Sequence, residues 1–202
     1  MWNQRFAGED YVFGREPARF VVREAARLDP GARVLSVAEG EGRNAVWLAG
    51  QGFDVTAIEG APNAVAKARR LATERGVSVD FRLADLEHWV WPEGAFDAVI
   101  AIFIQFARAP LRDRIFAGMK RAVRPGGLIL LHGFAPRQVD YGTGGPPNRE
   151  QMYTEALLRN AFAEFRILSL RDYDEEIDEG KGHSGRAALV DLVARKPSPD
   201  LR

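Results

Sequence analysis

Apolar runs alternate with amphipathic stretches along most of the chain. The nearly continuous, β-prone runs lie at 33–38, 54–59, 79–84, 96–103 and 128–134. Apolar positions with helical spacing lie at 17–28, 43–51, 62–75 and 112–123. Because strands and helices alternate, and the strands read as fully buried, the pattern predicts a mostly parallel sheet with helices on both faces.

The C-terminal third departs from this alternation. A loop rich in Gly and Pro (135–149) precedes an expected helix at 150–163. Two strand-like stretches, 165–173 and 188–195, are joined by the turn-rich segment 179–185. The short connection predicts a hairpin rather than another crossover. The expected fold is therefore α/β and Rossmann-like, a seven-stranded, mostly parallel sheet that ends in a C-terminal antiparallel β-hairpin.

Composition narrows the function classes. The chain has 28 Lys+Arg against 28 Asp+Glu, a formal net charge of zero, which argues against a broad nucleic-acid footprint or a polybasic membrane anchor. With no Cys, a disulfide framework, a zinc ribbon, an iron–sulfur cluster and a thiol nucleophile are all excluded. No apolar run approaches the ~18 residues of a membrane span, and the N-terminus does not lead into a signal peptide. A cytoplasmic protein is expected.

The segment most informative about function is the turn after the first strand. Gly40 and Gly42 lie between this strand and a helix, where backbone approaches a ligand closely and helix N–H groups are unpaired. Glu59 ends the second strand and Asp85 ends the third. Each feature alone also fits a tight connection or a solvated carboxylate. Together they occupy the carboxyl edge of an open sheet and predict a nucleoside-containing ligand.

Two ligands fit this turn. Gly40-x-Gly42-x-x-Ala45 with Glu59 satisfies the dinucleotide fingerprint, which would make the chain an NAD(P)-dependent reductase. Against this, 202 residues leave little room for a separate substrate domain, and Glu39 and Glu41 would repel a pyrophosphate. An acidic loop suits S-adenosylmethionine, which carries an α-ammonium and a sulfonium and no phosphate.

With these features, the chain resembles the class I S-adenosylmethionine-dependent methyltransferases. The resemblance rests on VLSVAEGEGRN, FDAVIAIF and RPGGLILL, and on the acidic strand ends. EGRN before an aliphatic helix is similar to the tellurite-resistance and thiopurine-type small-molecule methyltransferases. Ser36 replaces the usual acidic residue of the first strand, and Ala38 replaces the usual first glycine. Ser36 therefore weakens the expectation that a carboxylate at this position organises the loop.

The resemblance implies a single methyltransferase domain over 1–202. Its parts would be an N-terminal cap and helix (1–30), a cofactor-binding core (31–134), and a lid loop, helix and terminal hairpin (135–196). The cofactor would be S-adenosyl-L-methionine, with S-adenosyl-L-homocysteine as product. The residues expected to contact it are Tyr11, Phe13, Glu39, Gly40, Glu41, Gly42, Asn44, Glu59, Gly60, Ala61, Ala84, Asp85, Leu86, Ile102 and Phe103.

The expected reaction is in-line methyl transfer to a small molecule with a soft S, Se or Te nucleophile. Topology brings Tyr141, His183 and Arg186 to loops above the sheet edge, and these are the candidate catalytic residues. Each also fits an ordinary surface role. His88 is expected in local packing and His132 in the core, and three scattered His without Cys predict no metal site.

The N-terminal aromatic residues and the distribution of charged residues add to the expected picture of the site. The aromatic residues Trp2, Phe6, Tyr11 and Phe13 either fold over the cofactor or pack against an outer helix. Acidic residues gather at the glycine turn, whereas Arg108, Arg137 and Arg186 lie in the loops above it, which suggests two opposed local fields. Neither a nucleic acid nor a membrane is an expected partner, and a homodimer stays open. A non-catalytic S-adenosylmethionine-binding sensor is the remaining alternative.

Overall fold

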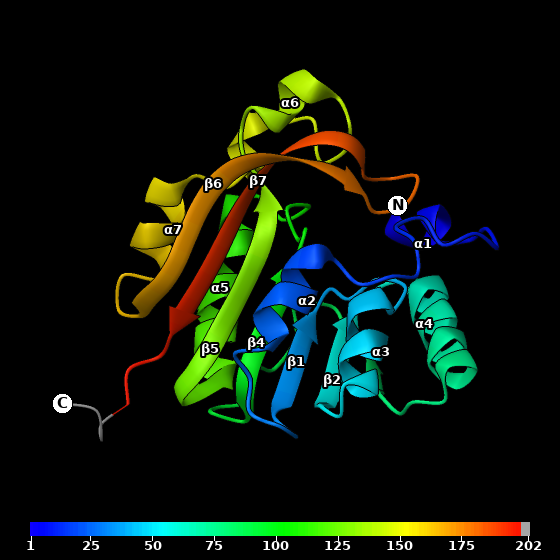
Figure 1. Cartoon of the computed structure of the whole chain (residues 1–202), viewed down its shortest axis with the longest axis horizontal. Coiled ribbons are helices and arrows are strands. Elements are labelled where there is room, and N and C mark those ends of the chain that lie inside the picture. The colour runs from blue at the N-terminus through cyan, green and yellow to red at the C-terminus, as the bar shows by residue number, and fades with distance from the viewer. Residues whose placement is uncertain (199–202) are drawn as a thin grey trace.

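The computed structural model describes residues 1–198, and one seven-stranded sheet runs through them (Figure 1). The strands are β1 (Arg33–Val37), β2 (Asp54–Glu59), β3 (Asp80–Leu83), β4 (Phe96–Ile102), β5 (Val123–Phe134), β6 (Arg166–Asp178) and β7 (Ser184–Arg195). Their order is β3-β2-β1-β4-β5-β7-β6, and β7 runs antiparallel to both of its neighbours while the other pairs are parallel. The expected fold class is confirmed.

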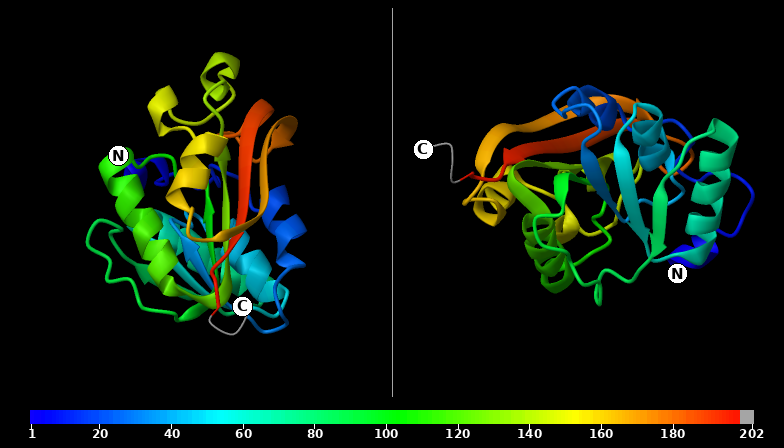
Figure 2. Two further views of the ribbon diagram at one scale, coloured as in Figure 1. Left: turned by 90° about the vertical axis from the view of Figure 1, so that its left-hand side faces the viewer. Right: turned by 90° about the horizontal axis from the view of Figure 1, so that it is seen from below.

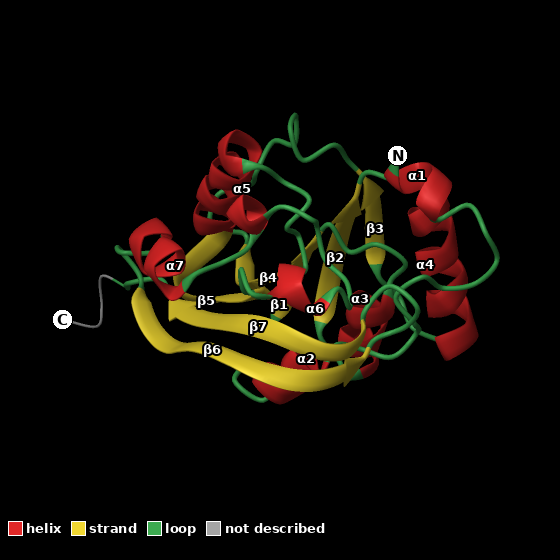
Figure 3. Cartoon of the chain, turned by 90° about the horizontal axis from the view of Figure 1, so that it is seen from above, coloured by secondary structure: helices red, strands yellow, loops and turns green. Residues whose placement is uncertain are grey.

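Helices cover both faces of this sheet. They are α1 (Trp2–Arg5), α2 (Arg19–Ala25), α3 (Arg43–Gly50), α4 (Pro62–Arg75), α5 (Ala109–Ala122), α6 (Gln138–Tyr141) and α7 (Glu155–Ala161), with a 3-10 turn η1 (Arg149–Gln151). The views in Figure 2 and Figure 3 place α5 and α7 on one face and α2 and α3 on the other. None of these helices is long and apolar enough to span a membrane.

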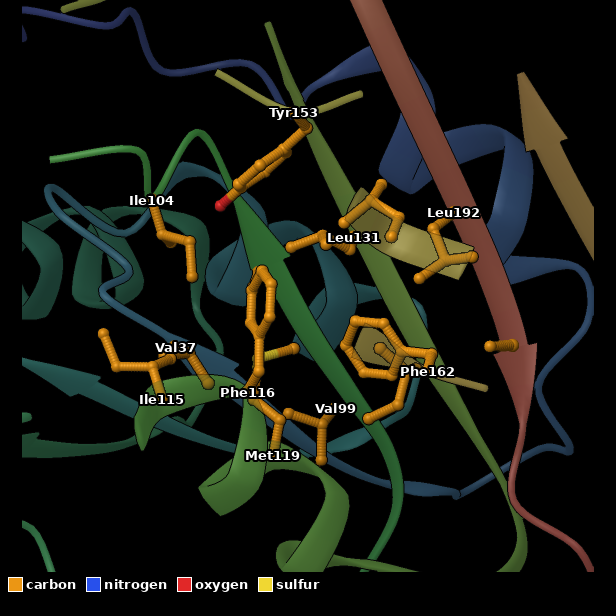
Figure 4. Packing of buried hydrophobic residues seen from close by; sticks show 14 of the residues in the cluster. Val37, Val99, Ile104, Ile115, Phe116, Met119, Leu131, Tyr153, Phe162 and Leu192 are labelled. Carbon is orange, nitrogen blue, oxygen red and sulfur yellow. The ribbon is translucent and has the colours of Figure 1, made fainter. Parts of the chain in front are cut away.

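The core lies in two layers, one on each side of the sheet. Successive residues of β4 alternate between them: Val99 packs in the layer under α5 and α7, and Ile100 in the layer under α2, α3 and α4. In the first layer Phe116 of α5 meets the rings of Tyr153 and Phe162 (Figure 4). Because both faces of the central strands are covered, they read as continuous apolar runs in the sequence.

Several element bounds differ from the sequence expectation. The hairpin strands β6 and β7 are longer than predicted, because β6 is an edge strand whose exposed positions accept the charged run RDYDEEID without disturbing the ladder. Helix α7 starts at Glu155, where the Thr154 side chain accepts a hydrogen bond from the Leu157 N–H. The RPGG segment lies within β5, which starts at Val123. Helices α1 and α6 were not expected.

The long hairpin brings two distant parts of the chain together. Its tip (residues 179–183) lies against the N-terminal segment (residues 1–14), and the Gly182 N–H donates to the Val12 carbonyl at 3.1 Å. The packing is close enough that a Cβ at Gly180 would stand 2.4 Å from the Gly14 nitrogen. These two segments, together with the loop at 135–149, stand above the carboxyl ends of the parallel strands (Figure 1).

Candidate active site

The turn after β1 is held by backbone conformations that favour glycine. Gly40 has φ +69° and Gly42 has φ +95°. A Cβ at Gly42 would stand 2.7 Å from the Cβ of Ala68, so this glycine lets α3 pack directly on α4. At Gly40 the nearest atom to such a Cβ is Phe6 Cζ at 4.0 Å, so a side chain there would enter the space between the turn and the N-terminal segment.

Glu39 organises the start of α3. The N-cap residue Gly42 has no side chain, and one Glu39 oxygen accepts from the N–H groups of Asn44 and Ala45, both at 2.9 Å. Its other oxygen accepts from the Ser36 hydroxyl. Burial raises the pKa of Glu39 above its usual range. The carboxylate that organises this loop thus comes three residues after Ser36, and Glu39 lines the cavity while its oxygens accept hydrogen bonds from the chain.

Glu41 anchors the N-terminal segment. It forms a buried ion pair with Lys67 at 2.7 Å and accepts from the Val12 N–H at 2.7 Å. Lys67 also donates to the Asp10 carbonyl at 2.6 Å. The interpretation of Glu39 and Glu41 as an acidic field for a cationic ligand is therefore wrong, because both carboxylates are neutralised or hydrogen-bonded within the chain. Their charge no longer decides between the two cofactors.

Glu59 and Asp85 stand where β2 and β3 end. Glu59 accepts from the N–H groups of Gly40 at 2.9 Å and Ala61 at 2.8 Å, and burial raises its pKa. Asp85 is exposed, and its pKa is lowered by hydrogen bonds from the Glu87 N–H and the His88 ring. The expectation that His88 packs locally is wrong: its side chain is 79% exposed, because it extends from the surface turn after β3.

A cavity of about 920 Å³ opens above these strand ends. Of the residues expected to contact a cofactor, the ones that line it are Phe13, Glu39, Gly40, Glu41, Asn44, Glu59, Gly60, Ala61, Ala84, Asp85, Leu86, Ile102 and Phe103. Two others lie outside the lining: Gly42 packs on Ala68, and the Tyr11 hydroxyl donates to the Lys67 carbonyl at 3.1 Å. The volume lies in the upper part of the usual range for small-molecule sites.

Aromatic rings form the roof of the cavity. Trp2, Phe6 and Phe13 contribute from the N-terminal segment, and the centroids of Trp2 and Phe106 are 6.2 Å apart. These aromatic side chains, Tyr11 apart, therefore lie over the strand ends, as one of the two sequence interpretations has it. The roof also includes the last part of the 135–149 loop, at 145–148.

His183 lies at the hairpin tip and lines the cavity. Its ring centroid is 4.7 Å from that of Phe13, 4.4 Å from Phe103 and 5.0 Å from Phe134. Burial, followed by the nearby charges of Arg43, Arg5 and His132, lowers the pKa of His183 to about 3. The imidazole is therefore neutral at physiological pH.

Arg43 is the buried cation of the cavity wall. It starts α3, is 7% exposed, and forms an ion pair with Glu179 of the hairpin tip at 2.7 Å. Among the described residues, four buried side-chain polar atoms have no hydrogen-bond partner, and two of them are Arg43 Nη1 and His183 Nδ1. The other two, Trp89 Nε1 and Tyr153 Oη, belong to residues outside the cavity lining.

The other two candidate catalytic residues lie away from the cavity. The Tyr141 hydroxyl and the Arg186 guanidinium both donate to Asp174, each at 2.7 Å, on the exposed side of the hairpin. Arg137 also pairs with Asp174, at 2.6 Å. The idea of opposed fields is wrong for Arg137 and Arg186, because exposed carboxylates of β6 neutralise them. Arg108 does line the cavity.

His132 is a core histidine, as expected. It is buried in β5, where its Nδ1 lies 2.6 Å from Asp191 of β7 and its ring stacks on Phe20 of α2. Arg23 of α2 also reaches Asp191, at 2.6 Å. The group ties α2 to the sheet. No set of three or more His, Cys, Asp or Glu side chains within residues 1–198 could hold a metal ion.

Sequence reasoning missed part of the cavity wall. Asn148 and Gln151 approach from the lid side, and Leu111 approaches from the start of α5. Gln151 donates to the Gln105 carbonyl at 2.8 Å, so its place depends on a contact 46 residues away. No local sequence signal marks these residues, because the fold alone brings them to the cavity.

Comparison with known proteins shows which protein family this part of the chain is similar to. Residues 34–127 match a family model described as a methyltransferase domain. This segment is therefore similar to methyltransferase domains, which agrees with the resemblance to the class I S-adenosylmethionine-dependent methyltransferases. The matched span holds β1 to β4, the glycine turn and both acidic strand ends, the part that the resemblance identified. The match favours the methyl donor over a nicotinamide cofactor.

Two curated relatives show how far the similarity extends. Hemagglutinin 1 of Eikenella corrodens is 27% identical over 91% of this chain and 61% of its own length. The ubiquinone biosynthesis O-methyltransferase of Xanthomonas axonopodis pv. citri (strain 306) is 38% identical over 53% of this chain and 45% of its own length. The chain thus spans about half the length of these relatives.

Solved structures extend the fold similarity beyond the matched span. A structure from work on the conversion of a disulfide bond into a thioacetal group during echinomycin biosynthesis has a TM-score of 0.80 at 22% identity, covering 98% of this chain and 93% of the other. TehB from Haemophilus influenzae has a TM-score of 0.70 at 21% identity, covering 87% and 61%. At these identities the likeness concerns the fold alone.

Proposed function

We propose that the chain is an S-adenosylmethionine-dependent methyltransferase that acts on a small molecule with a soft S, Se or Te nucleophile. One observation carries the proposal: a single cavity joins the glycine turn, the Glu59 carboxylate and an aromatic roof within a methyltransferase domain. The bound donor would supply a methyl group already activated by a sulfonium.

The residues of the turn fit this donor. Glu59 lines the cavity and its oxygens retain lone pairs beyond those used by Gly40 and Ala61, as a ribose diol requires. The open space at Gly40 lets a ligand approach the backbone directly. Ile102, Phe103 and Leu86 offer apolar surface beside Asp85 for a flat base.

The rest of the chain positions the acceptor and excludes water. The N-terminal segment, the hairpin tip and the lid end close over the strand ends, so a small acceptor would be held against the donor in a dry site. His183, with a pKa of about 3, is a neutral imidazole at neutral pH and is too weak a base to deprotonate an alcohol efficiently. An acceptor that ionises readily by itself, such as a thiol or selenol, needs no stronger base.

Calorimetric titration with S-adenosylmethionine, S-adenosylhomocysteine and NADPH tests the donor. We expect the first two to bind and NADPH not to bind. Stabilisation by NADPH alone would refute the proposal. Transfer of a labelled methyl group to a panel of thiols, selenite, tellurite and matched alcohols then tests the acceptor, and donor binding with no transfer to any of them would favour a sensor.

A further inference from the structure

Among the described residues that line the cavity, two have a buried nitrogen atom that lacks any hydrogen-bond partner. Arg43 Nη1 and His183 Nδ1 belong to side chains that are 7% and 6% exposed, and both residues line the cavity. Buried donors are rarely left unpaired, because the loss of hydration is not repaid. Such atoms in a ligand cavity point to a group that the ligand supplies.

The two nitrogens belong to one rigid unit. Arg43 Nη2 binds Glu179, and the Glu179 N–H donates to the His183 carbonyl at 2.8 Å. The Gly182 N–H in the same turn donates to Val12, so the N-terminal segment supports the unit from above. Arg43 is also close enough to His183 to lower its pKa. The pair is held in place before any ligand arrives.

The charge around this unit favours an anion. Arg43 and Arg5 both contribute positive potential at His183, while within residues 1–198 Glu179 is the carboxylate that pairs with Arg43. The other carboxylates of the cavity wall are engaged elsewhere: Glu39 on α3, Glu41 on Lys67, Glu59 on the glycine turn, and Asp85 on the Glu87 N–H and the His88 ring. Guanidinium and imidazole N–H groups are the usual partners of a carboxylate.

The surroundings of the unit are flat and apolar. Phe13, Phe103 and Phe134 pack around the His183 ring, and all three line the cavity. Aromatic walls of this kind accept a ring edge-on or in an offset stack. A ligand that satisfies both features carries an acidic group on, or next to, an aromatic ring.

We propose that Arg43 and His183 form an acid-binding subsite for the acceptor, which is an aromatic carboxylic acid that also carries the nucleophile. That the bound acid is the methyl acceptor rests on the proposed function. The binding of an aromatic acid can nevertheless be measured without any turnover. Because both nitrogens are shielded from solvent, the acid enters while the covering segments are displaced. The donor occupies the glycine-turn end of the same cavity.

The test compares benzoate with benzamide, which have the same shape but differ in charge. We expect the wild-type chain, saturated with S-adenosylhomocysteine, to bind benzoate at least roughly tenfold more tightly in calorimetry. The double variant Arg43→Gln/Glu179→Gln removes the cation without leaving Glu179 buried and unpaired, and it should abolish the preference. Equal binding of the two probes to the wild type would overturn the proposal.

A matched control and a second variant guard against loss of folding. Arg19→Gln/Glu175→Gln removes an exposed ion pair (3.1 Å) between α2 and the same hairpin, and should leave the preference unchanged. His183→Phe keeps a ring among the three phenylalanines and should lower the preference severalfold. A retained preference in both cavity variants, each shown to be folded by near-ultraviolet circular dichroism, would overturn the proposal.

The donor's own α-carboxylate is the competing source of the acid. If Arg43 serves the donor, benzoate and S-adenosylhomocysteine will compete, and the Arg43 double variant will lose affinity for S-adenosylhomocysteine instead. That result would overturn the acceptor subsite. If the wild type binds no S-adenosylhomocysteine but still prefers benzoate, the proposed function fails and the acid subsite stands. If the wild type binds S-adenosylhomocysteine but shows no preference for benzoate, the acid subsite fails and the proposed function stands.

Discussion

The two ends of the cavity are built differently. At the glycine-turn end each carboxylate is already occupied: Glu39 accepts from two N–H groups of α3, and Glu59 accepts from Gly40 and Ala61. At the hairpin end, Arg43 Nη1 and His183 Nδ1 are buried without a partner. The carboxylates of one end are held by hydrogen bonds within the chain, whereas the other end keeps two buried nitrogen atoms without a partner.

This difference separates stability from recognition. A group whose hydrogen bonds are satisfied within the chain stabilises the fold, and its removal leaves orphaned partners behind. A buried group without a partner costs free energy in the folded chain and recovers it on binding. Substitutions of Gly42 and Glu39 at the glycine-turn end should therefore act mainly on stability, and those at the hairpin end mainly on ligands and on pH dependence. Glu59 contributes to both, because its oxygens have lone pairs left for a ligand.

The largest effect on stability is expected at Gly42. Gly42→Ala places a Cβ 2.7 Å from the Cβ and 2.8 Å from the Cα of Ala68, at a φ of +95°. The clash with backbone forces α3 and α4 apart, and the positive φ adds strain, for a combined loss of about 3 kcal/mol or more. Urea denaturation measures the loss.

Gly52→Ala is the matched control. It has a similar φ of +88°, but nothing lies within 4 Å of its added Cβ. It should cost only the backbone strain, roughly 1–2 kcal/mol. Equal decreases in the free energy of unfolding for the two variants would show that the close contact with Ala68 does not contribute to the effect of Gly42→Ala.

Glu39→Ala is the next largest change. It leaves the N–H groups of Asn44 and Ala45 buried without an acceptor, which should lower the free energy of unfolding by about 2–3 kcal/mol. Glu59→Gln keeps one acceptor oxygen but turns an NH2 group toward the N–H of either Gly40 or Ala61, so one N–H loses its acceptor instead of two. Its stability loss should therefore be smaller, while donor affinity falls about tenfold or more. Calorimetry with S-adenosylhomocysteine and urea titration together separate the two. A larger stability loss in Glu59→Gln than in Glu39→Ala would contradict the role of Glu39 as the group that caps α3.

The same contrast explains what the sequence could predict. Strand, glycine turn, helix and Glu59 follow one another within about thirty residues, and each rests on a local signal. The bounds of α4 follow from Pro62 and Gly76 in the same way, because proline starts a helix and a left-handed glycine ends it. These parts of the fold were predicted correctly, and Gly40 and Glu59 line the cavity, while their contact with a cofactor stays a prediction.

The hairpin end could not be predicted, because its contacts join distant parts of the chain. Arg43 pairs with Glu179 across 136 residues, and the N-terminal segment meets the hairpin tip through Val12 and Gly182. For an acidic side chain in the glycine turn, the sequence also does not distinguish a carboxylate that caps a helix from one that contacts a ligand. Glu39 was misread for that reason.

His183 gives a smaller effect that depends on pH. Its pKa falls from 6.5 when unfolded to about 3 in the folded chain, so between these values only the unfolded chain binds the proton. Stability is therefore present above pH 6.5 and is lost as the pH falls toward 3. His183→Phe lacks this linkage. The wild type should lose about 2 kcal/mol relative to the variant between pH 6.5 and pH 5.

Urea titrations of both proteins at a series of pH values measure that difference. Acidic groups titrate in both chains and cancel in the subtraction, apart from those that contact His183. Parallel pH profiles would show that the ring is solvated or protonated in the folded chain, which would remove the physical basis for treating the hairpin end as a buried, unsatisfied site.

Tyr141→Phe should have the smallest effect, and it tests where the site ends. The Tyr141 hydroxyl donates to Asp174, which also receives Arg137 and Arg186 on the exposed side of the hairpin. The pKa of Asp174 is low chiefly because of the Tyr141 hydrogen bond, so it should rise in the variant, as carboxyl chemical shifts can follow. Donor affinity, benzoate preference and methyl transfer should each change less than about twofold, since an exposed interaction is largely screened by water. A larger loss of transfer with unchanged donor affinity would place Tyr141 in the catalytic site and would extend the hairpin end of the cavity to the lid.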